Sequence, residues 1–185
     1  MQAFLVSTAA VALAEIGDKT QLLSLILATK YRRPWPICLG ILGATLLNHA
    51  LAGSVGALVA AWLSPAQLKW IVAGSFLAVA AWTLVPDRAD DELAAKRAGH
   101  GVLLATLVAF FLAEMGDKTQ VATVILAAEY HPLWQVVAGT TLGMLAANVP
   151  VVWLGVRFAA RLPLRAARLG TALLFAALAL WIVLR

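Results

Sequence analysis

Hydrophobic residues form long, nearly continuous runs along this chain, and polar residues interrupt the runs at only a few places. Each run holds roughly the 20 mostly apolar residues that one α-helix needs to cross a bilayer. Continuous runs with interspersed glycines favour helices over the alternating segments of a membrane β-barrel. The pattern predicts an all-α integral membrane protein with six transmembrane helices. We expect these helices over residues 2–29, 36–62, 68–86, 100–128, 134–158 and 166–184.

Composition supports lipid as the solvent of this chain. Of its 185 residues, 63% are hydrophobic and only 12% are charged, and the mean hydropathy is +0.90. A soluble domain of this length could not bury so much apolar surface. Because almost no residue is left over for a soluble domain, we expect a single membrane domain over residues 1–185.

The net charge of +5 reports the orientation of the chain and gives no reason to expect a nucleic-acid partner. If the N-terminus lies outside, ten of the 14 basic residues fall in the inside segments, and such an excess is typical of cytoplasmic loops. The ten are Lys30, Arg32, Arg33, Arg88, Lys96, Arg97, Arg157, Arg161, Arg165 and Arg168. We therefore predict a multi-pass protein of the cell inner (plasma) membrane with both termini outside.

The most informative feature is an internal repeat. Residues 13–35 align with residues 112–134 at a fixed offset of 99, with 13 identities in 23 positions. With one residue inserted, the alignment continues to Asn48 and Asn148. A repeat of this kind decides the fold, because each copy must form the same supersecondary unit.

The repeat predicts two halves of opposite orientation. Repeat one covers residues 1–86, a charged linker covers 87–98, and repeat two covers 99–185. Each half holds three predicted spans, an odd number, so the second half must enter the membrane upside down. Two inverted three-helix repeats are an architecture of many secondary transporters, whose substrate site lies near the midplane between the halves.

The repeated segment places acids inside predicted spans. Glu15 lies near the middle of the first span and Glu114 near the middle of the fourth. A charged side chain there costs on the order of 3 kcal/mol or more and is usually functional. Glu15 and Asp18 are three residues apart, so on a continuous helix they share one face, as do Glu114 and Asp117.

Gly17 and Gly116 lie between the acids of each motif. They permit either the close approach of another helix or a local helix break that frees backbone carbonyl groups. Inversion of one half would bring the two acidic clusters together at one site.

Lys19 and Lys118 add two positive charges to the four predicted carboxylates. The formal surplus is then −2, which one divalent cation or two protons would neutralise. We interpret both lysines, with Thr20 and Thr119, as gating or ion-pairing residues. Two alternatives stay open: the lysines extend to the cytoplasmic rim, or Lys19 pairs with Glu15 four residues earlier.

The predicted metal ligands are all oxygen donors. They are Glu15, Asp18, Glu114, Asp117, Gln21, Gln120, Asn48 and Asn148. Such a site suits Mn²⁺ or Ca²⁺ better than Mg²⁺, which gives up its water reluctantly. Zinc or copper would favour Cys and His, and Cys38 has no counterpart in the second half. His49 also lacks a counterpart, so it is either a proton relay or a hydrogen-bonded interior histidine.

Protons and a metal ion compete for closely spaced carboxylates, and this competition is the physical basis of antiport. The chain has no P-loop for ATP, so an ion gradient is the expected driving force. We predict a transporter with no prosthetic group, a divalent cation as its substrate and H⁺ as the counter-ion.

The two motifs, EIGDKT at Glu15–Thr20 and EMGDKT at Glu114–Thr119, are copies of E-x-G-D-[KR]-[ST]. They resemble the Golgi transmembrane protein 165 family of cation exchangers over the whole chain. The resemblance implies Mn²⁺ or Ca²⁺ exchange for protons, with motif acids corresponding to Glu15, Asp18, Glu114 and Asp117. The short linker and the lack of a targeting segment lead us to expect the bacterial Mn²⁺ exporter branch.

Three other functions compete with Mn²⁺ efflux by alternating access. The first is a Ca²⁺/H⁺ antiporter that uses the same site. The second is a basic small-solute exporter, which the lysines beside the acids disfavour. The third is an intramembrane lipid-phosphate enzyme, which would need an arginine- or serine-rich phosphate cradle that neither motif has. The sequence is compatible with a homo-oligomer but does not predict one.

Overall fold

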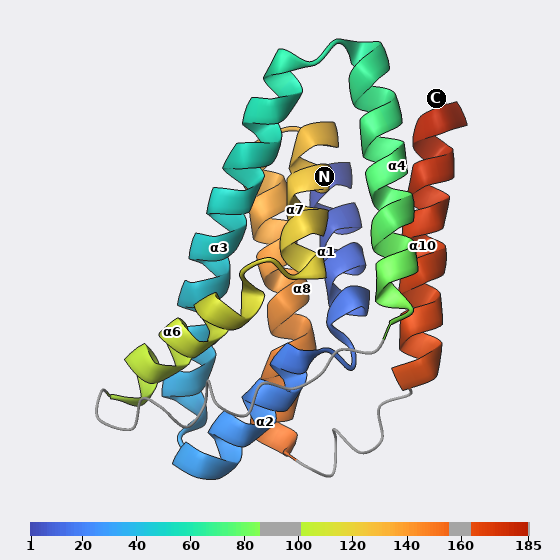
Figure 1. Cartoon of the computed structure of the whole chain (residues 1–185). Helices are drawn as coiled ribbons and strands as arrows, with labels where there is room; N and C mark the ends of the chain where they lie inside the picture. The colour runs from blue at the N-terminus through green and yellow to red at the C-terminus, as the bar shows by residue number, and fades with distance from the viewer. Residues whose placement is uncertain (86–100, 156–163, 185) are drawn as a thin grey trace.

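The computed structural model describes residues 1–85, 101–155 and 164–184, and these residues form α-helices without any β-strand (Figure 1). The first half contains α1 (Gln2–Glu15), α2 (Lys19–Tyr31), α3 (Pro34–Trp62) and α4 (Pro65–Thr83). The second half contains α6 (Val102–Glu114), α7 (Lys118–Glu129), α8 (Leu133–Leu154) and α10 (Leu164–Leu184). The linker 87–98 and the basic residues Arg88, Lys96, Arg97, Arg157 and Arg161 lie outside the described residues.

The predicted helices over 2–29 and 100–128 are each interrupted, which is the local helix break that the sequence left open at Gly17 and Gly116. Each stretch is two helices, with a break at residues 16–18 between α1 and α2 and at residues 115–117 between α6 and α7. The other four predicted helices are confirmed as helices, with ends that differ by a few residues. Among the residues that the structure describes, α3 and α8 are the two helices long and apolar enough on their own to cross a membrane.

Sequence signals explain where α3 and α4 begin. Arg33 precedes α3, and the fixed backbone angle of Pro34 suits the first helical position. Ser64 caps α4: its hydroxyl accepts a hydrogen bond from the Gln67 backbone N–H while the Gln67 side chain accepts one from the Ser64 N–H. The Ser64 cap lies at the sharp α3–α4 turn at the top of Figure 1.

The helices of the two halves run in opposite directions. In Figure 1, α1 and α2 descend while α6 and α7 rise, α3 rises while α8 descends, and α4 descends while α10 rises. The main contacts pair one half with the other: α1 packs on α8, α3 on α6 and α7, and α4 on α10.

Two close helix contacts repeat at the same offset. A Cβ on Gly40 would lie 2.8 Å from the Leu103 carbonyl oxygen, and a Cβ on Gly139 would lie 2.5 Å from that of Phe4. Gly139 lies 99 positions after Gly40, and Leu103 lies 99 positions after Phe4. The α3–α6 and α8–α1 interfaces are therefore equivalent, and glycine allows each pair of backbones to approach.

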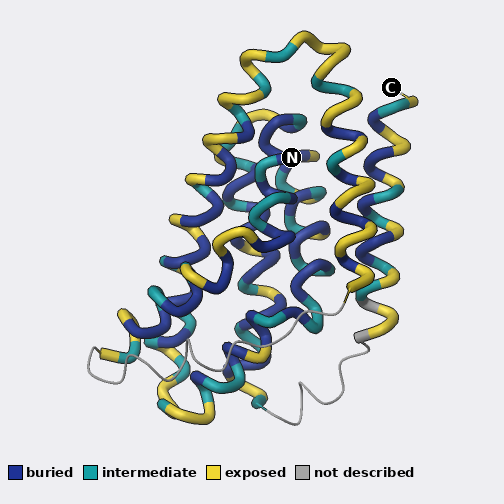
Figure 2. The backbone as a smooth tube through the Cα atoms, in the orientation of Figure 1, coloured by how far each residue is buried: buried dark blue, intermediate teal, exposed yellow. Residues whose placement is uncertain are grey.

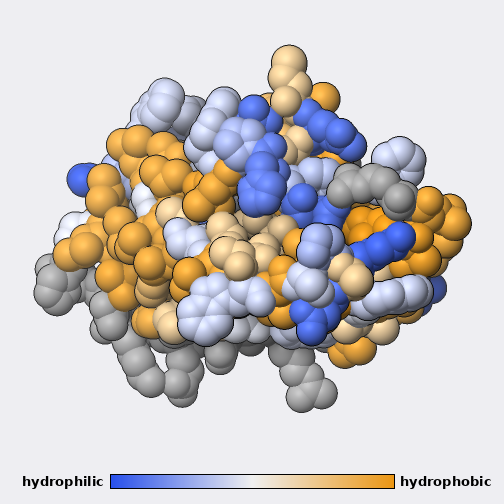
Figure 3. Space-filling view, turned by 90° about the horizontal axis from the view of Figure 1, so that it is seen from above, coloured by the Kyte–Doolittle hydropathy of each residue, from blue (hydrophilic) through white to orange (hydrophobic). Residues whose placement is uncertain are grey.

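Polar and apolar residues are distributed as expected for a protein in lipid. Large apolar side chains such as Leu39, Leu47 and Leu58 face outward on α3, while acids and threonines are buried inside. Figure 2 shows this outward exposure along α3, α4 and α10, and the view from above in Figure 3 shows hydrophobic residues mainly along the left and right sides. This arrangement places the four motif acids between helices rather than at the surface.

Candidate cation-binding site at the two helix breaks

The two helix breaks have nearly the same backbone geometry. Gly17 has a φ of 81° and Gly116 a φ of 73°, both in the left-handed region that glycine adopts without strain. The following aspartates, Asp18 and Asp117, then take φ/ψ values of −81°/166° and −82°/162° as the N-caps of α2 and α7. Of the two roles predicted for these glycines, the structure shows the helix break.

Because of the break, the two acids of each motif do not lie on one continuous helix. Glu15 is the last residue of α1, and Asp18 precedes α2, so the expectation that they share one face of a continuous helix is wrong. Glu114 and Asp117 are placed in the same way. The aspartates instead stand at the N-termini of α2 and α7, where the helix dipole favours negative charge.

A glutamine side chain supports each break. Gln21 Oε1 accepts a hydrogen bond of 2.8 Å from the Gly17 N–H, and Gln120 Oε1 accepts one of 2.7 Å from the Gly116 N–H. Gln21 Nε2 donates to the Ala147 carbonyl at 2.9 Å, whereas Gln120 Nε2 donates to Asn48 Oδ1 at 2.7 Å. Each glutamine thus ties its break to α8 or α3, and a role as a metal ligand stays a prediction.

Replacement of these glutamines is expected to destabilise the fold unequally. Gln21→Ala leaves the Ala147 carbonyl and the Gly17 N–H without their partners in a buried and a partly buried setting. We expect a loss of about 2 kcal/mol, against about 1 kcal/mol for Gln120→Ala, whose contact to Gly116 is exposed. Melting temperatures of the two purified variants measure this difference, and an equal or larger loss in Gln120→Ala would contradict it.

The glutamates of both halves meet with one aspartate. Single carboxylate oxygens of Glu15, Glu114 and Asp117 lie within 4.8 Å of one another, and all three residues are buried. Thr20 Oγ1 donates to Glu15 Oε2, and Thr119 Oγ1 donates to Glu114 Oε2 at 2.9 Å. Within the described part of the chain, Oε1 of each glutamate has no hydrogen-bond partner, so each can still bind a cation or a proton.

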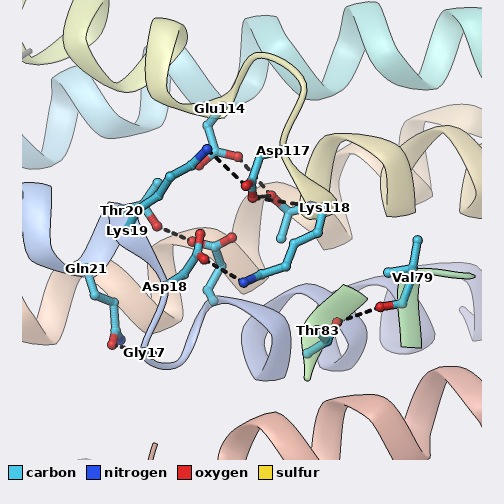
Figure 4. Close-up of polar contacts among 12 residues, drawn as sticks. Gly17, Asp18, Lys19, Thr20, Gln21, Val79, Thr83, Glu114, Asp117 and Lys118 are labelled. Atoms are coloured by element: carbon cyan, nitrogen blue, oxygen red, sulfur yellow. Dashed lines mark hydrogen bonds and ion pairs between the residues drawn. The ribbon is translucent and has the colours of Figure 1, made fainter. Parts of the chain in front are cut away.

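Each motif lysine reaches the aspartate of the opposite half (Figure 4). Lys19 Nζ lies 3.0 Å from Asp117 Oδ1, and Lys118 Nζ lies 2.6 Å from Asp18 Oδ1. The alternative of a Lys19–Glu15 pair along one helix is wrong, because α2 begins only at Lys19. Extension to the rim is wrong for Lys118, which is 3% exposed. These crossed pairs link the two repeats.

The asparagines occupy non-equivalent positions. Asn148 Nδ2 approaches Glu15 Oε2 at 3.4 Å, and its Oδ1 accepts a hydrogen bond of 2.8 Å from Ser24. Asn48 Oδ1 accepts a hydrogen bond from Gln120, and its Nδ2 donates one of 3.5 Å to the Phe111 carbonyl, so its hydrogen bonds among the described residues do not involve Glu15 or Glu114. Ser24 was not among the predicted site residues, although its position three residues after Gln21 places it on the same face of α2.

His49 is fully buried, and neither ring nitrogen has a hydrogen-bond partner among the described residues. The interpretation as a hydrogen-bonded interior histidine is therefore wrong for this conformation. A role as a proton relay stays a prediction.

The site offers several oxygen donors and two lysines, and all four motif carboxylates are buried. This is the chemistry of a hard divalent cation that exchanges with protons. The sequence profile of the family described as divalent cation/proton antiporter GDT1 matches residues 3–91 and 102–185. The chain belongs to the GDT1 family. This match confirms the resemblance indicated by the two motifs, and it makes the chain a membrane transporter rather than an enzyme.

Curated relatives agree with the GDT1 assignment. A Vibrio cholerae serotype O1 protein named "Putative manganese exporter" is 53% identical over 181 residues, which cover 97% of this chain and 90% of that protein. A GDT1-like protein of Synechocystis is 28% identical over 194 residues, covering 95% of this chain and 93% of its own length. No solved structure matches the chain.

Proposed function

We propose that this GDT1 protein exports Mn²⁺ in exchange for protons by alternating access. The observation that carries the proposal is the buried cluster of the Glu15, Glu114 and Asp117 carboxylates. In this cluster Oε1 of each glutamate has no hydrogen-bond partner among the described residues. Oxygen ligands of this kind suit Mn²⁺. The name of the Vibrio cholerae relative supports manganese as the substrate.

The proposed architecture is a single membrane domain of six spans in two inverted repeats, 1–86 and 99–185. The opposite directions of equivalent helices and the equivalent contacts of Gly40 and Gly139 support it. In this arrangement α1 with α2, and α6 with α7, each cross the membrane as one broken span. Broken helices that meet near the midplane are the usual construction of a transporter site. The excess of inside basic residues supports an inner-membrane location with both termini outside.

The charges of the site explain how metal and protons alternate. Four motif carboxylates and the two paired lysines give a formal charge of −2 when all six are ionised. One Mn²⁺ neutralises this charge on the way out, and two protons neutralise it on the return. A buried site with an uncompensated charge of −2 is costly, so the empty and unprotonated carrier is disfavoured and exchange is coupled.

Ca²⁺ is the second candidate substrate, because the same oxygen donors suit it and because the family description specifies a divalent cation without naming one metal. Charge alone does not separate the two ions. The basic small-solute exporter finds no support in the structure, since Lys19 and Lys118 already occupy the aspartates that would bind an ammonium group.

Reconstituted transport tests the proposal directly. Purified protein is placed in liposomes with an acid interior, and internal dyes report metal and pH. We expect Mn²⁺ to enter as protons leave, with collapse of both fluxes when a protonophore removes the gradient. Parallel measurements with Ca²⁺ establish the preferred ion. If well-folded protein moved neither ion, or moved metal without any proton flux, the antiport proposal would be wrong.

A further inference from the structure

Three of the four motif acids form one carboxylate cluster and the fourth lies outside it, although both repeats contain the acids in the same order. Among the described residues, the carboxylate group within 4.8 Å contains Glu15, Glu114 and Asp117 and does not include Asp18. Asp18 Oδ1 lies instead 2.6 Å from the ammonium group of Lys118. The site therefore holds both glutamates but the aspartate of one repeat only.

The two lysine–aspartate pairs also differ in their surroundings. The side chains of Lys118 and Asp18 are 4% and 0% exposed, whereas the Lys19 side chain is 25% exposed beside Asp117. Asp117 accepts hydrogen bonds from Thr119 of its own helix, and Asp18 makes no side-chain cap hydrogen bond to α2. One pair is enclosed, and the other borders the surface.

The motif residues do not explain this difference, because both copies contain the same Glu, Gly, Asp, Lys, Thr and Gln. The two motif copies have these same residues and run in opposite directions. A second arrangement is therefore available, in which the lysine–aspartate pair of each copy takes the surroundings of the other. A carrier with alternating access needs two such arrangements of similar free energy. The asymmetry therefore does not come from the motif residues themselves, and alternation between two conformations accounts for it.

We propose that Lys19 and Lys118 are positioning residues that act in turn, each withdrawing the aspartate of the opposite repeat from the two glutamates. In the arrangement described here, Lys118 holds Asp18 away and Asp117 is the third carboxylate. In the opposite arrangement, Lys19 holds Asp117 in an enclosed pair and Asp18 joins the glutamates. This inference rests on the proposed exchange function and specifies how its site changes between the two states.

Electrostatics favours three carboxylates over four at the ion. A fourth carboxylate would add repulsion in a buried site, while an enclosed lysine neutralises the aspartate that it holds. The partly exposed Lys19 is better solvated than Lys118, and an exposed ion pair is weak. A divalent cation can therefore compete with Lys19 for Asp117 more easily than with Lys118 for Asp18.

Paired substitutions test the inference without leaving an unpaired buried charge. One variant combines Asp18→Asn with Lys118→Gln, and its matched counterpart combines Asp117→Asn with Lys19→Gln. The half-saturating Mn²⁺ concentration for Mn²⁺/Mn²⁺ exchange is measured at each membrane face, in right-side-out and in everted vesicles. We expect each variant to raise this concentration about tenfold or more at one face and less than about twofold at the other. The affected face is opposite for the two variants.

Equal rises at both faces, or no rise in either variant, would overturn the alternation. Wild-type exchange is measured first, and its absence would contradict the proposed function. If the wild type exchanges Mn²⁺ but the variants change the half-saturating Mn²⁺ concentration equally at both faces, only the role of the lysines is contradicted. If a paired variant does not reach the membrane, the charge swap D18K/K118D replaces it, or D117K/K19D for the other pair. Each swap keeps both charges, and the same face-specific rise is expected.

Discussion

Glu15→Gln and Glu114→Gln are each expected to lower proton-coupled Mn²⁺ transport at least about a hundredfold. Both side chains are fully buried, and each has one oxygen without a partner among the described residues. A glutamine keeps the size of the side chain and can still accept the hydrogen bond from Thr20 or Thr119. It removes the negative charge that binds the dication and the group that takes up the proton.

The matched control is Glu129→Gln, which neutralises a carboxylate at the other end of α7, outside the cluster. We expect this variant to transport at about the wild-type rate. Transport is measured in liposomes with an acid interior, and the amount of each reconstituted variant is determined on the same samples. If Glu15→Gln or Glu114→Gln kept more than about a tenth of the wild-type rate, the glutamates would not form the exchange site.

The chemistry of this site could be predicted from sequence because it depends on residue types. Glu15 and Glu114 are improbable in apolar runs, and their repetition at an offset of 99 indicates that both halves contribute to one site. The odd number of spans in each half predicts opposite directions, and the described helices run that way. Helix positions in the apolar runs follow from hydropathy, as α3 and α8 show.

The geometry of the site could not be predicted because it depends on contacts between the repeats. The sequence left Gly17 with two roles, and only the observed φ of 81° distinguishes a helix break from a close packing contact. The spacing of Lys19 suggested Glu15 as a partner along one helix, but the break removes that helix and Asp117 lies 3.0 Å away. Likewise, the sequence predicted Gln21 as an oxygen ligand of the metal, and in the structure that oxygen accepts a hydrogen bond from the Gly17 N–H.

Gly56→Ala is expected to cost about 3 kcal/mol or more of stability, the largest structural effect we predict. A Cβ at this position of α3 would lie 2.1 Å from the Val124 carbonyl oxygen of α7. The obstacle is backbone, so no side-chain rotation relieves the contact, and α3 and α7 must move apart. For a chain of this length the loss corresponds to a melting temperature lower by roughly 6–12 °C.

Gly74→Ala is the matched control, because it makes the same substitution within α4 and its new Cβ would meet no atom within 4 Å. Alanine also favours a helix by about 1 kcal/mol over glycine, so its melting temperature should equal or exceed that of the wild type. A Gly56→Ala protein as stable as Gly74→Ala would show that α3 and α7 do not pack this closely.

Because Lys118 and Gln120 lie on the first turn of α7, separation of α7 from α3 also moves the residues that hold Asp18 and Gly116. Gly56→Ala should therefore lose transport as well as stability, although it lies outside the cation site.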